Sequence, residues 1–135
     1  HAQGFHYFDK GIKRLVIELE FAHFVIFLVH LSIRFRHRQY QLRDLYGMFA
    51  DVAKPMIVAG DFNIFWGDRE LELFMAAAGL RNANVDGLPT FPALNPRRQF
   101  DFILHSDGID ISHFEVPEVH FSDHLPLLCD FEVKG

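Results

Sequence analysis

The segment Gly60-Asp61-Phe62-Asn63 places two chemically useful side chains at the end of an apolar run, residues 55–60. In extended backbone, residues two apart point to the same side, so Asp61 and Asn63 can present a carboxylate and an amide to one point. Oxygen ligands of this kind suit Mg²⁺. The same pattern is also typical of a simple Asx turn, and the spacing alone does not decide between the two interpretations.

The segment Ser122-Asp123-His124 adds a second carboxylate and a group that titrates near neutral pH. Asp101 lies inside the apolar run 100–104, where a carboxylate is costly unless it has a partner. One interpretation makes Asp101 the residue that orients His124, as the carboxylate orients the base in a catalytic triad. The alternatives are a polar turn at 122–124 and an edge strand on which Asp101 faces water.

Histidine and arginine side chains near these segments are further candidates. His30 ends the most apolar run of the chain, where a histidine is more often structural than catalytic. Arg97 and Arg98 precede Asp101, so contact with a phosphate group is a reasonable expectation for both. A second basic cluster, expected to be a solvated helix surface, consists of Arg34, Arg36, Arg38 and Arg43.

The elements that must position these residues alternate along the chain. Hydrophobic periodicity predicts strands at 14–21, 24–31, 55–60, 100–104, 111–116 and 127–133 and helices at 37–52 and 68–78. In the first strand, Ile17 and Leu19 share one face, and Glu18 and Glu20 share the other, expected to be exposed. Both helices are expected on one side of a mixed sheet, which gives an α+β fold of the sandwich type and leaves the other sheet face to be covered.

Composition limits the classes of protein that this sequence can represent. A length of 135 residues fits a single domain over 1–135, and a net charge of −5 excludes a broadly basic nucleic-acid-binding surface. A single cysteine excludes an intramolecular disulfide and a cysteine-rich zinc site. The longest apolar run, 24–29, is far too short to cross a bilayer.

The order of the polar segments is more specific than any one of them. Val29-His30-Leu31, Val58-Ala59-Gly60-Asp61-Phe62-Asn63, Phe100-Asp101-Phe102-Ile103-Leu104 and Ser122-Asp123-His124-Leu125-Pro126 together resemble the endonuclease/exonuclease/phosphatase superfamily, over residues 11–133. The resemblance implies the deoxyribonuclease I-like four-layer sandwich, in which two sheets pack face to face with helices outside. This chain would supply mainly one mixed sheet and its outer helices, as the C-terminal portion of such a domain.

The resemblance also implies a function. It predicts a phosphoesterase that depends on Mg²⁺ or Mn²⁺ and cleaves a phosphodiester or phosphomonoester by attack of water. Asp61 would orient or activate that water and, with Asp123, would hold the metal. The substrate would be a phosphate ester such as a nucleic acid, a phospholipid headgroup or an inositol phosphate.

Four further roles follow from the same resemblance. Asn63 would position the water or the phosphate, and His30 would form a hydrogen bond with the scissile phosphate. His124 would act as general base or would stabilise the charged transition state. Asp101 would orient His124.

Departures from the family pattern lead to alternatives. Family domains are longer, and their N-terminal half carries the glutamate that is the principal metal ligand. Glu18 and Glu20 do not follow that pattern, so the chain could be a catalytically inert fragment or assembly module. The 16 phenylalanines predict an apolar sheet face that favours self-association or binds a missing N-terminal half. The remaining alternative is an unrelated α/β domain in which all these segments are turns.

Overall fold

The larger sheet is built around the two most apolar segments of the chain. These are β3 (Val25–His30) and β4 (Met56–Asp61), which lie parallel to each other near the middle of a six-stranded sheet. The computed structural model describes residues 2–7, 15–65, 67 and 69–135. The strand order is β1 (Ala2–Tyr7), β2 (Leu15–Glu20), β3, β4, β6 (Asp101–His105) and β5 (Arg81–Asn82). The other neighbouring strands are antiparallel, so the predicted mixed sheet is confirmed.

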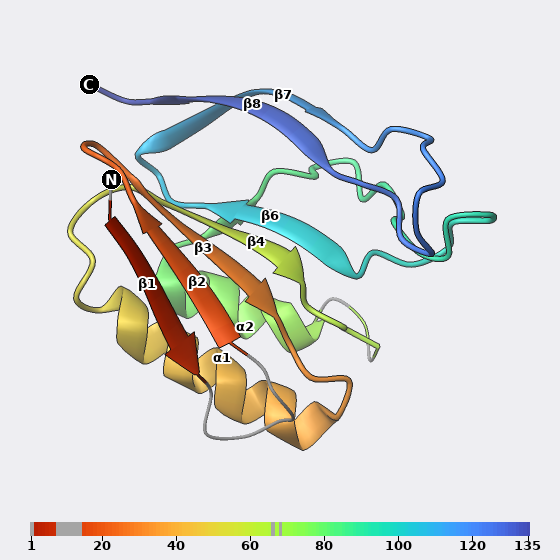
Figure 1. Cartoon of the computed structure of the whole chain (residues 1–135), viewed down its shortest axis with the longest axis horizontal. Helices are drawn as coiled ribbons and strands as arrows, with labels where there is room; N and C mark the ends of the chain where they lie inside the picture. The colour runs from red at the N-terminus through yellow and green to blue at the C-terminus, as the bar shows by residue number, and fades with distance from the viewer. Residues whose placement is uncertain (1, 8–14, 66, 68) are drawn as a thin grey trace.

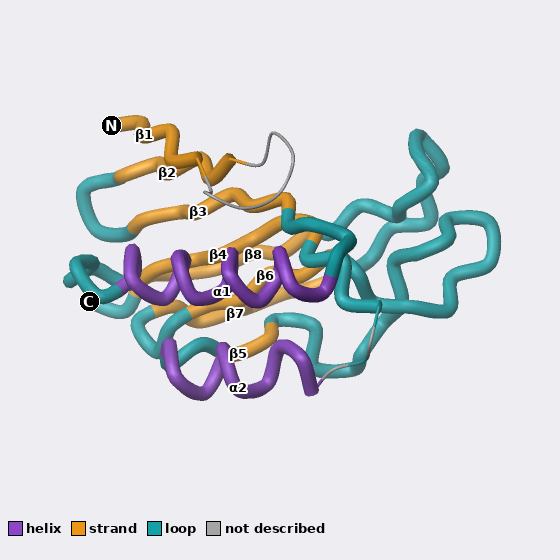
Figure 2. The backbone as a smooth tube through the Cα atoms, turned by 90° about the horizontal axis from the view of Figure 1, so that it is seen from below, coloured by secondary structure: helices purple, strands orange, loops and turns teal. Residues whose placement is uncertain are grey.

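Two helices cover one face of this sheet, as Figures 1 and 2 show. They are α1 (Phe35–Phe49) and α2 (Arg69–Ala78). Leu42, Leu45 and Phe74, which lie at helical spacing on these helices, are buried, whereas Tyr46 on the same stripe is half exposed. Within the part of the chain that the structure describes, neither helix is long and apolar enough to span a bilayer.

The last two strands form a second layer. β7 (Ile109–Glu115) and β8 (Leu128–Val133) pair with each other in a separate antiparallel sheet. This hairpin lies above the side of the large sheet that contains β4 and β6, on the face opposite the helices (Figure 1). The order of layers is therefore helices, mixed sheet and second sheet, in agreement with the predicted α+β sandwich.

The predicted elements agree with the observed ones within three residues at each end, but two strands were not predicted. β1 is an edge strand that contains Gly4 and has little apolar alternation, and β5 has only two residues. Two predicted positions, Arg14 and Asp68, lie outside the described residues.

The prediction that the glutamate face of β2 is exposed holds at Glu20 but is wrong for the rest of that face. Val16, on the same face as the two glutamates, is fully buried and lies opposite Val29 of β3. Glu18 and Glu20 extend from this face to His6 and Lys54, with N–O distances of 2.7 Å in both pairs. Alternation identifies two faces but does not tell which of them meets the helices.

The expectation that Arg38 is solvated was also wrong. Its side chain is completely buried beneath α1 and forms an ion pair with Glu70 of α2. The guanidinium also donates to the carbonyl groups of Ser32 and Ile33, in the turn that follows β3. Arg38 is therefore a structural residue that ties both helices to the end of a central strand.

Candidate active site

The register of three neighbouring strands sets three of the predicted site residues in one row. His30 of β3 lies beside Asp61 of β4, and Asp61 lies opposite Asp101 of β6. Cross-strand neighbours project from the same face of a sheet, which here is the face opposite the helices. Each residue stands at an end of an apolar strand, so the hydrophobic strands carry these polar groups to a common edge.

Gly60 allows this row to form. Its φ is +143°, and a Cβ atom at this position would lie 1.8 Å from the carbonyl oxygen of Val29. The close approach of β3 and β4 beside Asp61 therefore requires a residue without a side chain.

Asp61 uses its two carboxylate oxygens differently. Oδ1 accepts a hydrogen bond of 2.9 Å from the backbone N–H of Asn63, which is the Asx turn considered from the sequence. Oδ2 lies between two imidazoles, 3.6 Å from Nε2 of His30 and 3.8 Å from Nε2 of His124. The turn and the functional arrangement are thus compatible, because one oxygen shapes the loop and the other faces the histidines.

His124 and Asp101 form a close hydrogen-bonded pair. Nδ1 of His124 lies 2.7 Å from Oδ2 of Asp101, and both side chains are mostly buried. Since a carboxylate only accepts, this contact places the ring proton on Nδ1 and leaves Nε2 directed toward Asp61. Phe91 packs beside the imidazole, with ring centroids 4.9 Å apart. The backbone N–H of His124 donates to Oγ of Ser122 at 2.9 Å, so the polar turn expected at 122–124 is also present.

The crowding of charges changes two pKa values. Burial raises the pKa of Asp61, and the adjacent carboxylate of Asp101 raises it further, against the opposing effects of the Asn63 amide and the two histidines. For His124, burial alone lowers the pKa. The hydrogen bond and the negative charge of Asp101, together with the charges of Asp61 and Asp123, outweigh this effect, so the pKa of His124 is raised.

Asp61, Asp101 and His124 form a cluster with metal-ligating ability. One potential ligand atom from each residue lies within 4.8 Å of the others. Two partly buried carboxylates that repel each other fit a hard divalent cation, whose charge would relieve that repulsion. Asp123 does not belong to this cluster of described residues; it is exposed, and its backbone carbonyl accepts a hydrogen bond from Ala93.

Other predicted residues lie around the cluster. Asn63 is buried, and its Nδ2 donates to the carbonyl of Leu31 at 2.8 Å, so this amide joins the turns that follow β3 and β4. Arg97 and Arg98 are exposed, and Arg98 contacts the carbonyl oxygen of Phe65 at 3.3 Å. The structure therefore brings His30, Asp61, Asp101 and His124 together.

A small cavity opens beside the two carboxylates. It has a volume of about 290 Å³, and Asp61, Asp101, Leu28, Ile103 and Leu127 are among the residues that line it. The two carboxylates that line this cavity, with the imidazole of His124 hydrogen-bonded to Asp101, can bind a cation, hold a water molecule and exchange a proton with it.

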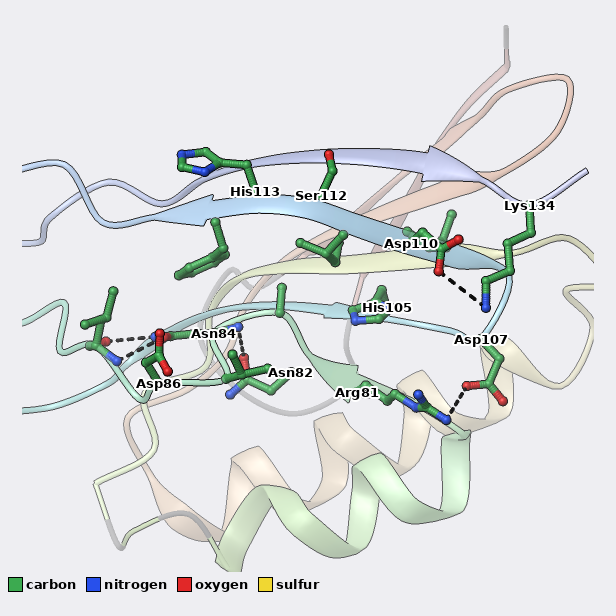
Figure 3. A pocket seen from close by; sticks show the side chains of 16 residues that line it. Arg81, Asn82, Asn84, Asp86, His105, Asp107, Asp110, Ser112, His113 and Lys134 are labelled. Atoms are coloured by element: carbon green, nitrogen blue, oxygen red, sulfur yellow. Dashed lines mark hydrogen bonds and ion pairs between the residues drawn. The ribbon is translucent and has the colours of Figure 1, made fainter.

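A groove of about 510 Å³ lies elsewhere, between β5, β6 and β7 (Figure 3). Its charged residues are mostly paired with each other: Arg81 lies 3.2 Å from Asp107, and Lys134 lies 3.4 Å from Asp110. None of the described residues that line it is a predicted site residue. We therefore assign the groove no part in the candidate site.

Sequence reasoning missed Thr90, which is completely buried behind the His124–Asp101 pair. Its hydroxyl oxygen accepts hydrogen bonds from the backbone N–H groups of Phe100 and Asp101. The available signal was a lone threonine between Pro89 and Phe91, in a stretch that otherwise reads as loop.

The comparisons with known proteins agree with this architecture. An endonuclease/exonuclease/phosphatase family protein from Bacteroides thetaiotaomicron is similar, with a TM-score of 0.80, 16% identity and coverage of 96% of this chain and 64% of that chain. Mannosyl-6-phosphatase Bt3783 from Bacteroides thetaiotaomicron VPI-5482 is similar with a TM-score of 0.77 and 15% identity, and the match covers 97% of this chain and 66% of that chain. D. rerio TDP2 complexed with a single-strand DNA product has a TM-score of 0.75 and 17% identity, and the match covers 98% of this chain and 68% of that chain. At these identities the similarity establishes the fold.

The chain spans about two thirds of the length of these solved structures. The comparison with curated proteins gave no match. The sequence model described as the Endonuclease/Exonuclease/phosphatase family matches residues 4–124, which is most of the chain. The chain therefore belongs to the endonuclease/exonuclease/phosphatase family.

Proposed function

We propose that this chain carries part of the active site of a metal-dependent phosphoesterase that hydrolyses a phosphodiester or a phosphomonoester. The observation that supports this proposal best is the cluster of Asp61, Asp101 and His124, with His30 beside it. Family membership and the names of similar structures, a mannosyl-6-phosphatase and a TDP2 bound to a DNA product, favour a phosphate-ester substrate. The substrate could be a nucleic acid, a phospholipid headgroup or an inositol phosphate.

Asp61 is the residue that we expect to hold Mg²⁺ or Mn²⁺, with Asp101 contributing charge and Asp123, the neighbour of His124, as the other proposed ligand. A divalent cation at this position would neutralise negative charge on a phosphate group and acidify a bound water molecule. Asp61 also has a raised pKa, so a cation there competes with a proton for the carboxylate.

The histidines supply the proton chemistry in this proposal. Asp101 fixes the ring of His124, so Nε2 faces Oδ2 of Asp61 at 3.8 Å, a separation that a water or phosphate oxygen can bridge. His124 then accepts a proton from the attacking water or stabilises charge as the phosphorus centre becomes pentavalent. His30 approaches the same carboxylate from the other side, and its exposed imidazole is positioned to donate to a phosphate oxygen.

The apolar surface next to this row supports a further part of the proposal. Phe5, Ile17 and Leu28 are cross-strand neighbours on the face that carries Asp61, and Phe5 and Leu28 are 58% and 39% exposed. We propose that a second copy of the chain, or an N-terminal half of the domain, covers this face. Several of the 16 phenylalanines from which an apolar sheet face was predicted, including Phe27 and Phe102, instead fill the core. A monomeric mass by light scattering, without binding of a hydrophobic dye, would contradict this part.

Hydrolysis of bis-p-nitrophenyl phosphate tests the catalytic proposal. We expect turnover that requires Mg²⁺ or Mn²⁺ and is lost in Asp61→Ala and His124→Ala. His113→Ala, at an exposed histidine of β7, provides the matched control and should keep full activity. A folded chain without turnover would favour the alternative of an inert fragment or assembly module. Equal activity in all variants would exclude this assignment of the site.

A further inference from the structure

Thr90 lies where three backbone segments meet beside the candidate site. Its carbonyl oxygen accepts a hydrogen bond of 2.7 Å from the N–H of Leu125, the residue that follows His124. Its own N–H donates to the carbonyl of Arg98 at 2.8 Å. The backbone of Thr90 thus ties the segment that carries His124 to the segment that leads into β6.

The hydroxyl group of Thr90 adds a second connection. Oγ1 accepts hydrogen bonds from the N–H groups of Phe100 and Asp101, at 3.2 and 3.3 Å. A hydroxyl oxygen has two lone pairs, so it can satisfy both amides. The same residue therefore fixes the backbone of Asp101 through its side chain and the backbone next to His124 through its carbonyl.

This double attachment spans the two partners of the 2.7 Å contact between Asp101 and His124. The side chain of Asp101 is short and has few rotamers, so its reach to Nδ1 depends on where its backbone is held. Phe91 follows Thr90 directly and packs against the imidazole of His124. The residue after Thr90 thus confines the ring from the side while Thr90 holds the backbone on either side of the pair.

We propose that Thr90 is a positioning residue that sets the separation of Asp101 and His124 and thereby keeps the neutral imidazole in its Nδ1–H form. Thr90 acts through the pair and does not touch the reacting atoms. Its effect on turnover rests on the proposed function, whereas its effect on the tautomer of His124 does not.

Substitutions that change only the hydroxyl test this proposal. Thr90→Val keeps the shape of the side chain but removes the acceptor, Thr90→Ser keeps the acceptor, and Thr90→Cys provides a weak one. Ile109→Val, at a buried position of β7, is the control for a small loss of core packing. The tautomer of His124 is read from the ¹⁵N shifts of the ring by long-range NMR correlation, at alkaline pH where the imidazole is neutral.

We expect the Nδ1–H form in the unmodified chain, in Thr90→Ser and in Ile109→Val. We expect a loss of that form toward Nε2–H in Thr90→Val and an intermediate population in Thr90→Cys. The series from serine to cysteine decides the question even if the valine variant does not fold. An unchanged tautomer in the valine and cysteine variants, or an equal loss in Ile109→Val, would overturn the proposal.

Turnover provides the second readout. With bis-p-nitrophenyl phosphate we expect kcat to fall about 10–100-fold in Thr90→Val with little change in KM, and Thr90→Ser to restore it. A fall in kcat that the serine variant does not restore would contradict a role for the hydroxyl. If the unmodified chain shows no turnover, the proposed function fails, and the tautomer measurement still tests Thr90.

Discussion

Asp61 and Asp101 occupy directly opposed positions in the antiparallel pair of β4 and β6, so two carboxylates face each other across neighbouring strands. Like charges in this arrangement destabilise a sheet. Burial raises the pKa of Asp61 most, and the negative charge of Asp101 raises it further, because both disfavour the ionised carboxylate. A cation bound between the carboxylates would relieve their repulsion, so the fold retains an unfavourable contact at the point where the chemistry is proposed.

Replacing Asp61 with asparagine should therefore stabilise the metal-free chain while removing its activity. We expect a gain of about 0.5–1 kcal/mol in the free energy of unfolding near pH 7, measured by urea denaturation. In the unmodified chain the folded state binds the Asp61 proton more tightly than the unfolded state does. Stability should therefore fall as the pH rises from the ordinary value of 3.8 through the raised pKa, and Asp61→Asn should reduce that fall. A less stable variant near pH 7 would show that the carboxylate repulsion is not significant.

Asp101 also raises the pKa of His124, against the effect of burial. Burial lowers this pKa, and the hydrogen bond and charge of Asp101 raise it above the ordinary value of 6.5. NMR titration of the metal-free chain should therefore show a lower pKa of His124 in Asp101→Asn than in the unmodified chain. The stability that protonated His124 contributes is fully present below pH 6.5 and is lost as the pH rises through the raised pKa. The same titration midpoint in both proteins would mean that the pair does not form in solution.

The convergence of three of the four central residues could be predicted because each of the three stands at the end of an apolar strand, whereas His124 lies in the loop before β8. His30, Asp61 and Asp101 follow or begin hydrophobic runs, and strands that pair in one sheet bring their ends to a common edge. The sequence did not reveal which face of β2 meets the helices, because alternation with a period of two is symmetric. It also did not reveal that Arg38 is buried, since an arginine in an amphipathic helix is usually exposed.

The residues that hold the site are harder to recognise than the residues that compose it. Asn63 was expected to position the water or the phosphate, and its role in joining the turns, where its Nδ2 donates to the carbonyl of Leu31, was not foreseen. Thr90 accepts hydrogen bonds from the backbone of Phe100 and Asp101, where β6 begins, and its neighbours predict only a loop. Side-chain to backbone contacts of this kind depend on the tertiary fold and leave no periodic pattern in the sequence.

Two glycines should respond in opposite ways to substitution by alanine. At Gly60 a Cβ would overlap the carbonyl of Val29 at positive φ, so Gly60→Ala should destabilise the chain by about 3 kcal/mol or more. At Gly47, inside α1, nothing lies within 4 Å of an added Cβ, and Gly47→Ala should stabilise the chain by about 0.5–1 kcal/mol. Thermal denaturation of the two variants checks this contrast. A tolerated alanine at position 60 would contradict the close approach of β3 and β4 beside Asp61.

The free energy of unfolding should fall much more when one partner of the buried pair of Arg38 and Glu70 is removed than when both are removed. Their side chains are 0% and 2% exposed, so Arg38→Met alone would leave the Glu70 carboxylate buried without its cation, at a cost of about 3–5 kcal/mol. The double variant Arg38→Met/Glu70→Leu removes both charges and should recover most of that loss, although the carbonyl groups of Ser32 and Ile33 lose their donor. A double-mutant cycle based on urea denaturation measures the coupling energy. Additive effects of the two single substitutions would show that the charges do not interact.

Because Arg38 also holds the turn that follows His30, we expect the double variant to lose turnover even where its stability recovers.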